Sequence, residues 1–148
     1  MNQKVEPVYT GGCHCGAVRY TAKGKPVVVA HCHCEDCQRM SGSGHSTGAM
    51  FGIENIEIIG KVKEYRLQSD HGNEVIKSFC PNCGSSLFGR NNGMQGFVTI
   101  ALGTMDDSSS LVPEVSVFNR NRKPWDIMDE NITVFETQPG WKPDDGLK

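Results

Sequence analysis

Seven cysteines fall into three close groups in this chain of 148 residues. The groups are Cys13-His14-Cys15, Cys32-His33-Cys34-Glu35-Asp36-Cys37 and Cys80-Pro81-Asn82-Cys83. An odd number of cysteines cannot form a fully paired disulfide framework, and the N-terminus lacks the apolar run of a secretory signal. We therefore expect a cytoplasmic protein in a reducing compartment, where clustered cysteines bind metal more often than they form disulfides.

The third group has the form of a zinc knuckle. In Cys80-x-x-Cys83 followed by Gly84, two thiolates reach one ion and the glycine lets the backbone turn tightly behind it. Structural zinc takes four ligands, and Cys13 and Cys15 supply the other two if their glycine-flanked segment is bent. The spacing therefore predicts one structural site, and the alternative is a chance knuckle with free buried thiols.

Three thiols remain, and their pattern differs from that of the structural site. Three protein ligands with one open position are typical of catalytic zinc, and this set is compact enough to form on one loop and the following turn: Cys32, Cys34 and Cys37. Two alternatives stay open. A histidine closes the coordination as an inert Cys₃His site, the candidates being His31, His33 and His45, or Cys34-x-x-Cys37 is a redox-active pair.

Short strands must position these groups, because 17 glycines and seven prolines leave little room for long helices. Runs rich in β-branched and aromatic residues predict strands at 18–22, 27–31, 75–79, 86–89, 97–102, 115–119 and 132–135. Segments 54–59 and 62–67 are expected to form the two arms of a hairpin around Gly60-Lys61. One helical turn is expected over 34–40, with Glu35 and Asp36 near its N-terminus. The pattern predicts an all-β fold.

Length, charge and hydropathy narrow the classes of protein. The chain is the size of one domain, 1–148, and we expect residues 137–148 to form a surface tail. The net charge of -2, without a basic block, argues against nucleic acid as a partner. No apolar run approaches 18 residues, which argues against a membrane span.

The three cysteine motifs in this order resemble those of the glutathione-dependent formaldehyde-activating enzyme family, also called centromere protein V-like. The motifs run from Gly12 to Val18, from Cys32 to Gly42 and from Phe79 to Ser85. The resemblance implies a Mss4-like fold of short antiparallel strands organised around zinc-binding cysteine loops. It also implies two zinc ions per chain, a structural one on Cys13, Cys15, Cys80 and Cys83 and a labile one on Cys32, Cys34 and Cys37.

The activity that the resemblance implies is a carbon–sulfur lyase reaction of the S-(hydroxymethyl)glutathione synthase type, in which glutathione adds to formaldehyde. The expected partner is therefore a small-molecule thiol, glutathione or its aldehyde adduct, and Cys32, Cys34 and Cys37 would be the catalytic ligands. Three thiolates more than neutralise a zinc ion, which favours delivery of a thiol over polarisation of the aldehyde. The alternatives are a non-catalytic glutathione carrier or protein-binding module, and a chromatin-associated module, which the charge disfavours.

Overall fold

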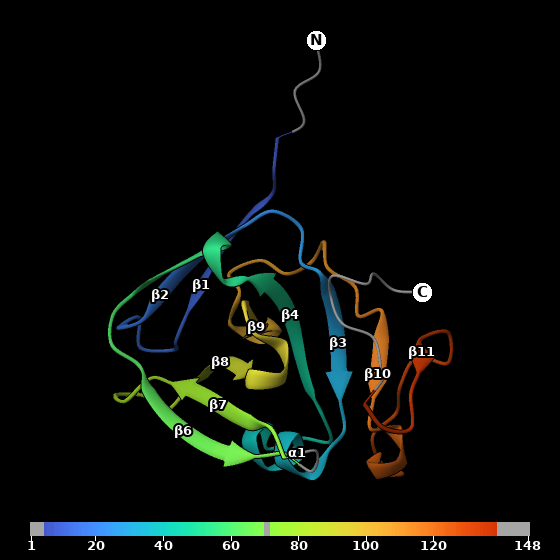
Figure 1. Ribbon diagram of the computed structural model, residues 1–148. Helices are drawn as coiled ribbons and strands as arrows, with labels where there is room; N and C mark the ends of the chain where they lie inside the picture. The colour runs from blue at the N-terminus through green and yellow to red at the C-terminus, as the bar shows by residue number, and fades with distance from the viewer. Residues whose placement is uncertain (1–4, 70–71, 139–148) are drawn as a thin grey trace.

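A computed structural model describes residues 5–69 and 72–138, in which strands dominate and one short α-helix is present (Figure 1). The strands are β1 Val8–Gly12, β2 Arg19–Lys23, β3 Val28–Cys32, β4 Ser46–Gly52, β5 Ile56–Ile59, β6 Lys63–Gln68, β7 Glu74–Phe79, β8 Ser86–Asn91, β9 Phe97–Ala101, β10 Val115–Val117 and β11 Thr133–Val134. The helix α1 spans Glu35–Ser41, and 3₁₀ turns occupy Ile53–Asn55, Asn92–Met94, Leu102–Thr104 and Asn119–Asn121. The expected all-β class is confirmed.

The strands form two sheets. One has three strands in the order β1-β2-β5, and the other has eight in the order β11-β10-β3-β4-β9-β8-β7-β6. Figure 1 shows the larger sheet curving from β6 and β7 on one side to β10 and β11 on the other, with α1 at its lower end. Pairing is antiparallel except that β10 runs parallel to both β3 and β11.

One face of the large sheet packs in the main core, and the opposite face lines a cavity. On β3, β4 and β9, alternate residues pack with the small sheet into the main core: Val29, Ala49, Phe51, Val98 and Ile100, joined by Val18, Tyr20 and Ala22 from the β2 region. Because side chains alternate along a strand, their neighbours point to the opposite face. Those neighbours, which include Ala30, Gly48, Met50 and Thr99, line a cavity.

The predicted hairpin over 54–59 and 62–67 is wrong. Both segments contain strands, but β5 pairs with β2 in the small sheet and β6 pairs with β7 in the large one. The chain changes sheets at Gly60, whose φ of 105° suits glycine. A Cβ there would lie 2.3 Å from the Ala17 carbonyl oxygen, so the turn packs against the start of β2. A strand's periodicity shows that it is extended but does not show which strand it pairs with.

Two strands were not expected from the sequence, because glycines depress their β-propensity. In β1, Gly11 lies against Tyr20 and the Thr104 carbonyl, where an added Cβ would come within 2.4 Å of that oxygen. In β4, a Cβ on Gly48 would come within 2.3 Å of Thr99 Cγ2. Close approach of neighbouring chains, rather than a turn, explains both glycines.

The expected helical turn is present as α1, one residue later at its start than predicted. Cys34 caps its N-terminus by accepting a hydrogen bond from the Cys37 amide, and Glu35 and Asp36 occupy the first turn. Gly42, with φ of 69°, ends it. No helix in the described ranges is long and apolar enough to cross a membrane.

The expected tail over 137–148 lies mostly outside the described residues, which end at 138. The two described residues contact the fold: the Thr137 carbonyl accepts a hydrogen bond from the Phe118 amide at 3.4 Å, and Gln138 borders the cavity.

Candidate functional site

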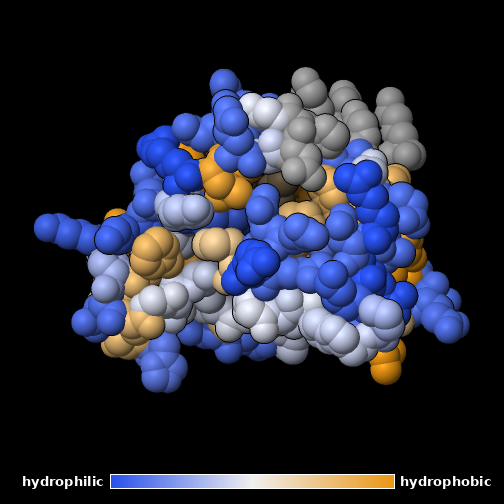
Figure 2. Space-filling model, turned by 90° about the horizontal axis from the view of Figure 1, so that it is seen from below, coloured by the Kyte–Doolittle hydropathy of each residue, from blue (hydrophilic) through white to orange (hydrophobic). Residues whose placement is uncertain are grey.

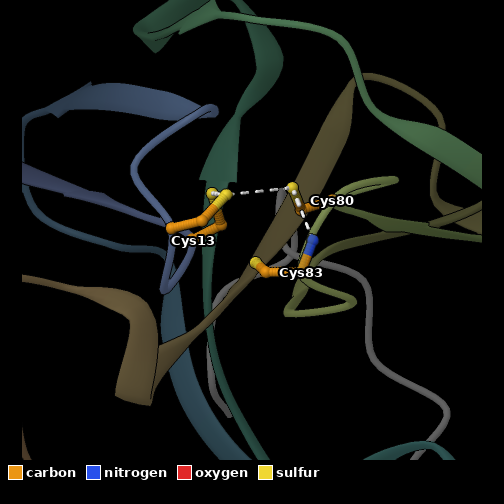
Figure 3. A group of neighbouring side chains, drawn as sticks. Cys13, Cys80 and Cys83 are labelled. Atoms are coloured by element: carbon orange, nitrogen blue, oxygen red, sulfur yellow. Dashed lines mark hydrogen bonds between the residues drawn. The ribbon is translucent and has the colours of Figure 1, made fainter.

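The first cysteine group joins two segments that are far apart in the sequence. Cys13 and Cys15 follow β1, and Cys80 and Cys83 follow β7, yet all four sulfurs lie within 4.8 Å of one another. Cys13 Sγ is 3.6 Å from Cys15 Sγ, which is 3.8 Å from Cys80 Sγ. Figure 3 shows the labelled sulfurs turned toward a common centre. The structure therefore brings together the four cysteines that the sequence pattern assigned to one structural site.

Tight turns behind the sulfurs produce this convergence. Gly16 has φ of 82° and its amide donates to the Cys13 carbonyl, while Gly84 has φ of 79° and its amide donates to the Cys80 carbonyl. Both positions favour glycine because an L side chain is strained there. A register shift between β7 and β8 at Ser78 and Phe79 leads the chain into the second turn. The bent segment expected from the glycines around Cys13 and Cys15 is present.

Hydrogen-bond donors favour the thiolate forms of two of these cysteines, Cys13 and Cys83. The Ser85 hydroxyl and amide lower the pKa of Cys83 to about 5. Burial raises the pKa of Cys13, but the Val18 amide, whose nitrogen lies 3.2 Å from its sulfur, and the Cys15 and Cys80 thiols lower it overall. Four close sulfurs, of which Cys13 and Cys83 are biased toward thiolate, fit a divalent thiophilic ion in a closed, structural type of site.

The second cysteine group lies where β3 ends and α1 begins. Cys32, Cys34 and Cys37 place their sulfurs within 4.8 Å of one another. Hydrogen bonds from the Cys32 and Cys34 thiols lower the pKa of Cys37 far below its ordinary value, and the positive charge of Lys77 and the Ser46 hydroxyl add to this. The same shared hydrogen bonds raise the pKa of Cys32. One thiolate held by two thiols is a donor set that a divalent ion fits, because the ion replaces the shared protons.

Within the part of the chain that the structure describes, no histidine joins this group. His31 Nδ1 is hydrogen-bonded to Thr47 Oγ1 at 2.7 Å. His33 Nδ1 faces the Gly44 carbonyl at 3.2 Å, and His45 Nδ1 lies 2.7 Å from Asp126 Oδ2. The geometry therefore favours a three-thiolate site over the Cys₃His alternative. All seven cysteines are free of disulfides, including Cys34 and Cys37 of the alternative redox pair.

The histidines form a cluster of their own beside the cysteines. The His31 and His45 rings meet edge to face with centroids 4.6 Å apart, and the His33 and His45 centroids are 5.1 Å apart. Burial, reinforced by the neighbouring His45 and His33, lowers the pKa of His31 to about 4. Burial also lowers the pKa of His33. His31 and His33 are therefore neutral near pH 7.

A cavity of about 270 Å³ opens beside the second cysteine group on the face of the large sheet that turns away from the core. Its walls are mainly apolar: Val28, Met50, Phe97, Val115, Val117 and Phe118. Seen from below, hydrophobic side chains lie recessed among hydrophilic ones, in agreement with such a lining (Figure 2). All three sulfur-bearing residues of the group line this cavity. A bound molecule there would have its reactive atom beside the thiolates.

One residue of the cavity wall, Phe118, has a strained backbone conformation. Phe118 has φ of 55° and ψ of 39°, the sole left-handed conformation among the described non-glycine residues. Such a conformation is costly for an aromatic residue and persists where surrounding contacts impose it. Here it joins the end of β10 to the 3₁₀ turn Asn119–Asn121, beside the His33 amide that donates to the Val117 carbonyl.

Charged side chains lie on the far wall, on β7 and β8. Lys77 and Arg90 both line the cavity, and Arg90 is paired with Glu64 at 2.8 Å. Gly89 leaves space for Lys77, whose Nζ would be 3.4 Å from a Cβ at that position. A second cavity of about 510 Å³ shares Cys37, Ser46 and Lys77 with the first and extends to His45.

Two residues of this region were missed in the sequence, Lys77 beside the second cysteine group and Asp126 in the histidine cluster. Lys77 lies on the strand that leads to the knuckle. Its two-residue spacing from Val75, which puts both side chains on one face of the strand, was a usable signal for the cavity face. Asp126 had no local signal, because its partners His33 and His45 are more than 80 residues away in the chain.

Three comparisons place the chain among known proteins. A model of the family described as glutathione-dependent formaldehyde-activating enzyme matches residues 8–121. No curated protein matches. Among solved structures, the chain is similar to a Rhodobacter sphaeroides protein studied in structural genomics, with 16% sequence identity, a TM-score of 0.53, and coverage of 66% of this chain and 87% of that one. This likeness concerns the fold alone.

The family match spans all three cysteine groups and most of the large sheet. It agrees with the order of motifs in the sequence and with the mainly β architecture built around cysteine clusters. The chain belongs to the glutathione-dependent formaldehyde-activating enzyme family.

Proposed function

We propose that this protein is a zinc-dependent enzyme of the carbon–sulfur lyase type that joins glutathione to formaldehyde as S-(hydroxymethyl)glutathione. The observation that carries the proposal is the three-cysteine group, which has no fourth ligand among the described residues and lines a cavity. An open coordination position that faces a cavity is the arrangement of a catalytic rather than a structural site. The closed four-cysteine group would hold a second, structural zinc.

The donor set supports zinc at both positions. Thiolates are soft ligands, and clusters of three or four of them select zinc over hard cations such as magnesium or calcium. A zinc ion on Cys32, Cys34 and Cys37 would supply a soft acceptor that keeps an incoming sulfur in its thiolate form. The ordinary pKa of a free thiol is about 8.5, so such binding would activate a group that is mostly protonated at neutral pH.

The chain's own residues account for binding and orientation. Glutathione has two carboxylates and one ammonium group, and the cavity offers Lys77 and Arg90 for the carboxylates and Asp36 for the ammonium. Of the arginines Arg39, Arg90, Arg120 and Arg122, only Arg90 lines this cavity. The apolar wall limits water near the thiolates, which strengthens each charged contact.

The direct test is the rate of condensation with zinc-loaded protein. We expect the approach to equilibrium between glutathione, formaldehyde and their adduct, followed by NMR exchange spectroscopy, to be faster than the spontaneous reaction. Cys37→Ser should retain the fold and lose the acceleration. Saturable glutathione binding without any acceleration would instead identify a carrier.

Lys77 is expected to contribute to glutathione affinity. Among the described residues it has no ion-pair partner, unlike Arg90, so its charge is available to a ligand carboxylate. A hydrogen bond to a charged group contributes about 1.5–3 kcal/mol, so Lys77→Met should weaken binding about tenfold or more in calorimetric titrations. The matched control is Lys63→Met, which removes an exposed lysine from the neighbouring β6 and should leave the glutathione affinity unchanged. Equal affinities of the two variants would remove Lys77 from the binding site.

A further inference from the structure

Asp126 and His45 form a hydrogen-bonded pair that the cysteine chemistry does not require. Asp126 lies in the segment between β10 and β11, and His45 directly precedes β4. Asp126 Oδ2 is 2.7 Å from His45 Nδ1 and 3.2 Å from His33 Nδ1. The Asp126 side chain is 9% exposed. A carboxylate this buried usually has a specific partner, and here the shorter contact is to His45.

The surrounding chain is shaped to hold this carboxylate. Gly44 has no side chain where Asp126 packs, because a Cβ there would lie 2.4 Å from Asp126 Oδ2. On the other side, Arg122 Nε donates a hydrogen bond to the Asp126 backbone carbonyl at 2.7 Å. The His31 ring lies edge to face with His45 and is itself anchored to Thr47. The carboxylate and the imidazole plane are thus both fixed by neighbours from separate segments.

The hydrogen bond settles which nitrogen of His45 carries the proton. An ionised carboxylate only accepts, so Nδ1 donates and Nε2 keeps its lone pair. His45 is 21% exposed at its side chain and lines the larger cavity together with Cys37 and Lys77. Its Nε2 is not among the buried polar atoms that lack a hydrogen-bond partner.

His33 differs from His45 because its side chain is not accessible from either cavity. Its side chain is fully buried, it lines neither cavity, and its Nε2 is buried without a hydrogen-bond partner among the described residues. Among the described histidines, only His45 combines a hydrogen-bonded carboxylate with an imidazole that lines the larger cavity. This is the arrangement by which a carboxylate holds a histidine for proton transfer.

We propose that His45 transfers the proton of the condensation reaction and that Asp126 is the residue that positions it. The inference rests on the proposed function, and the chemistry balances without an oxidant or reductant. His45 Nε2 takes the proton from the thiol sulfur, the sulfur–carbon bond forms as the carbon–oxygen π bond of formaldehyde breaks, and Nε2 returns the proton to the oxygen. The reverse sequence releases formaldehyde.

The first test compares variants of the zinc-loaded full chain. General acid–base catalysis contributes about 10²–10⁴-fold, so His45→Gln should lower kcat by roughly 100-fold or more with little change in KM. Added imidazole should restore part of the rate of His45→Ala, which a merely structural histidine would not allow. Asp126→Asn should also lower kcat, whereas Asp129→Asn, an exposed carboxylate on the same segment, should not.

The second test needs no variant and no activity. Nitrogen-15 NMR of the wild-type imidazoles should show His45 as the Nδ1–H tautomer. The Nε2–H tautomer would overturn the proposal, even if a variant failed to fold. Metal analysis supplies a further control: His45→Gln should bind as many ions as the wild type, and the loss of one ion would show that His33, His45 and Asp126 hold a metal instead.

The outcomes separate the two proposals. A wild-type protein that does not accelerate the condensation overturns the proposed function and this inference with it. An active wild type together with an equally active His45→Gln overturns the inference alone. Loss of kcat, rescue by imidazole and an unchanged metal content together establish it.

Discussion

Cys80→Ser is expected to prevent the protein from folding. Cys80 is fully buried and joins the turn after β7 to the turn after β1, so a metal held there ties together the two ends of a long loop. Structural zinc contributes apparent free energies of about 10–16 kcal/mol in small peptides, comparable to the total stability of a domain at about 5–15 kcal/mol. Loss of one ligand should therefore remove most of the free energy of unfolding.

Cys37→Ser is the matched control, because its group connects only the end of β3 to α1. This variant should stay folded and lose a single ion. Circular dichroism and thermal unfolding, with metal content measured in parallel, distinguish the two variants. In the wild type, mild chelation should remove one ion and leave the fold intact. A Cys80→Ser protein as stable as the wild type, or loss of both ions together with the fold under mild chelation, would contradict unequal roles for the two groups.

S-methylglutathione is expected to bind much more weakly than glutathione. The two molecules share the peptide and both carboxylates, and so the same proposed contacts to Lys77 and Arg90, which line the cavity. Only glutathione can ionise at sulfur and reach the open position among Cys32, Cys34 and Cys37. We expect an affinity difference on the order of 100-fold, which corresponds to about 2.7 kcal/mol.

Calorimetry of zinc-loaded protein in buffers of different ionisation enthalpy would measure the affinity. It would also show whether the proton that glutathione loses on binding as thiolate passes to the buffer or stays on the protein. The metal-free protein is the control, and there the two ligands should bind alike. Equal affinities in the loaded protein would show that sulfur does not reach the metal, which would end the thiol-activation mechanism and leave the fold unaffected.

The sequence was sufficient to predict which cysteines make up each of the two groups. Cys32, Cys34 and Cys37 are near neighbours, so their convergence depends mainly on one strand end and one helical turn. Joining Cys13 and Cys15 to Cys80 and Cys83 needed only the count of ligands that zinc takes. Most strand positions were also predictable, because β-branched runs between glycines are extended whichever neighbours they pair with.

Strand partners were not predictable, and the hairpin expected around Gly60 shows why. Gly60 does mark a change of direction, but the choice between pairing β5 with β6 or with β2 depends on contacts that no local pattern contains. The same limit hid the glycine-bearing strands β1 and β4, which are stabilised by close approach to Tyr20 and Thr99.

The sequence alone therefore determined the ligands that could hold metal, because their chemistry depends on residue type and short spacing. Only the tertiary structure decided what surrounds them. The cavity exists because alternate side chains of the large sheet face away from the core. The charge of Lys77 acts on Cys37 because the fold brings both residues to this cavity. Asp126 meets His45 across 81 residues of chain, since the segment after β10 returns to the start of β4, where Gly44 leaves room for a carboxylate.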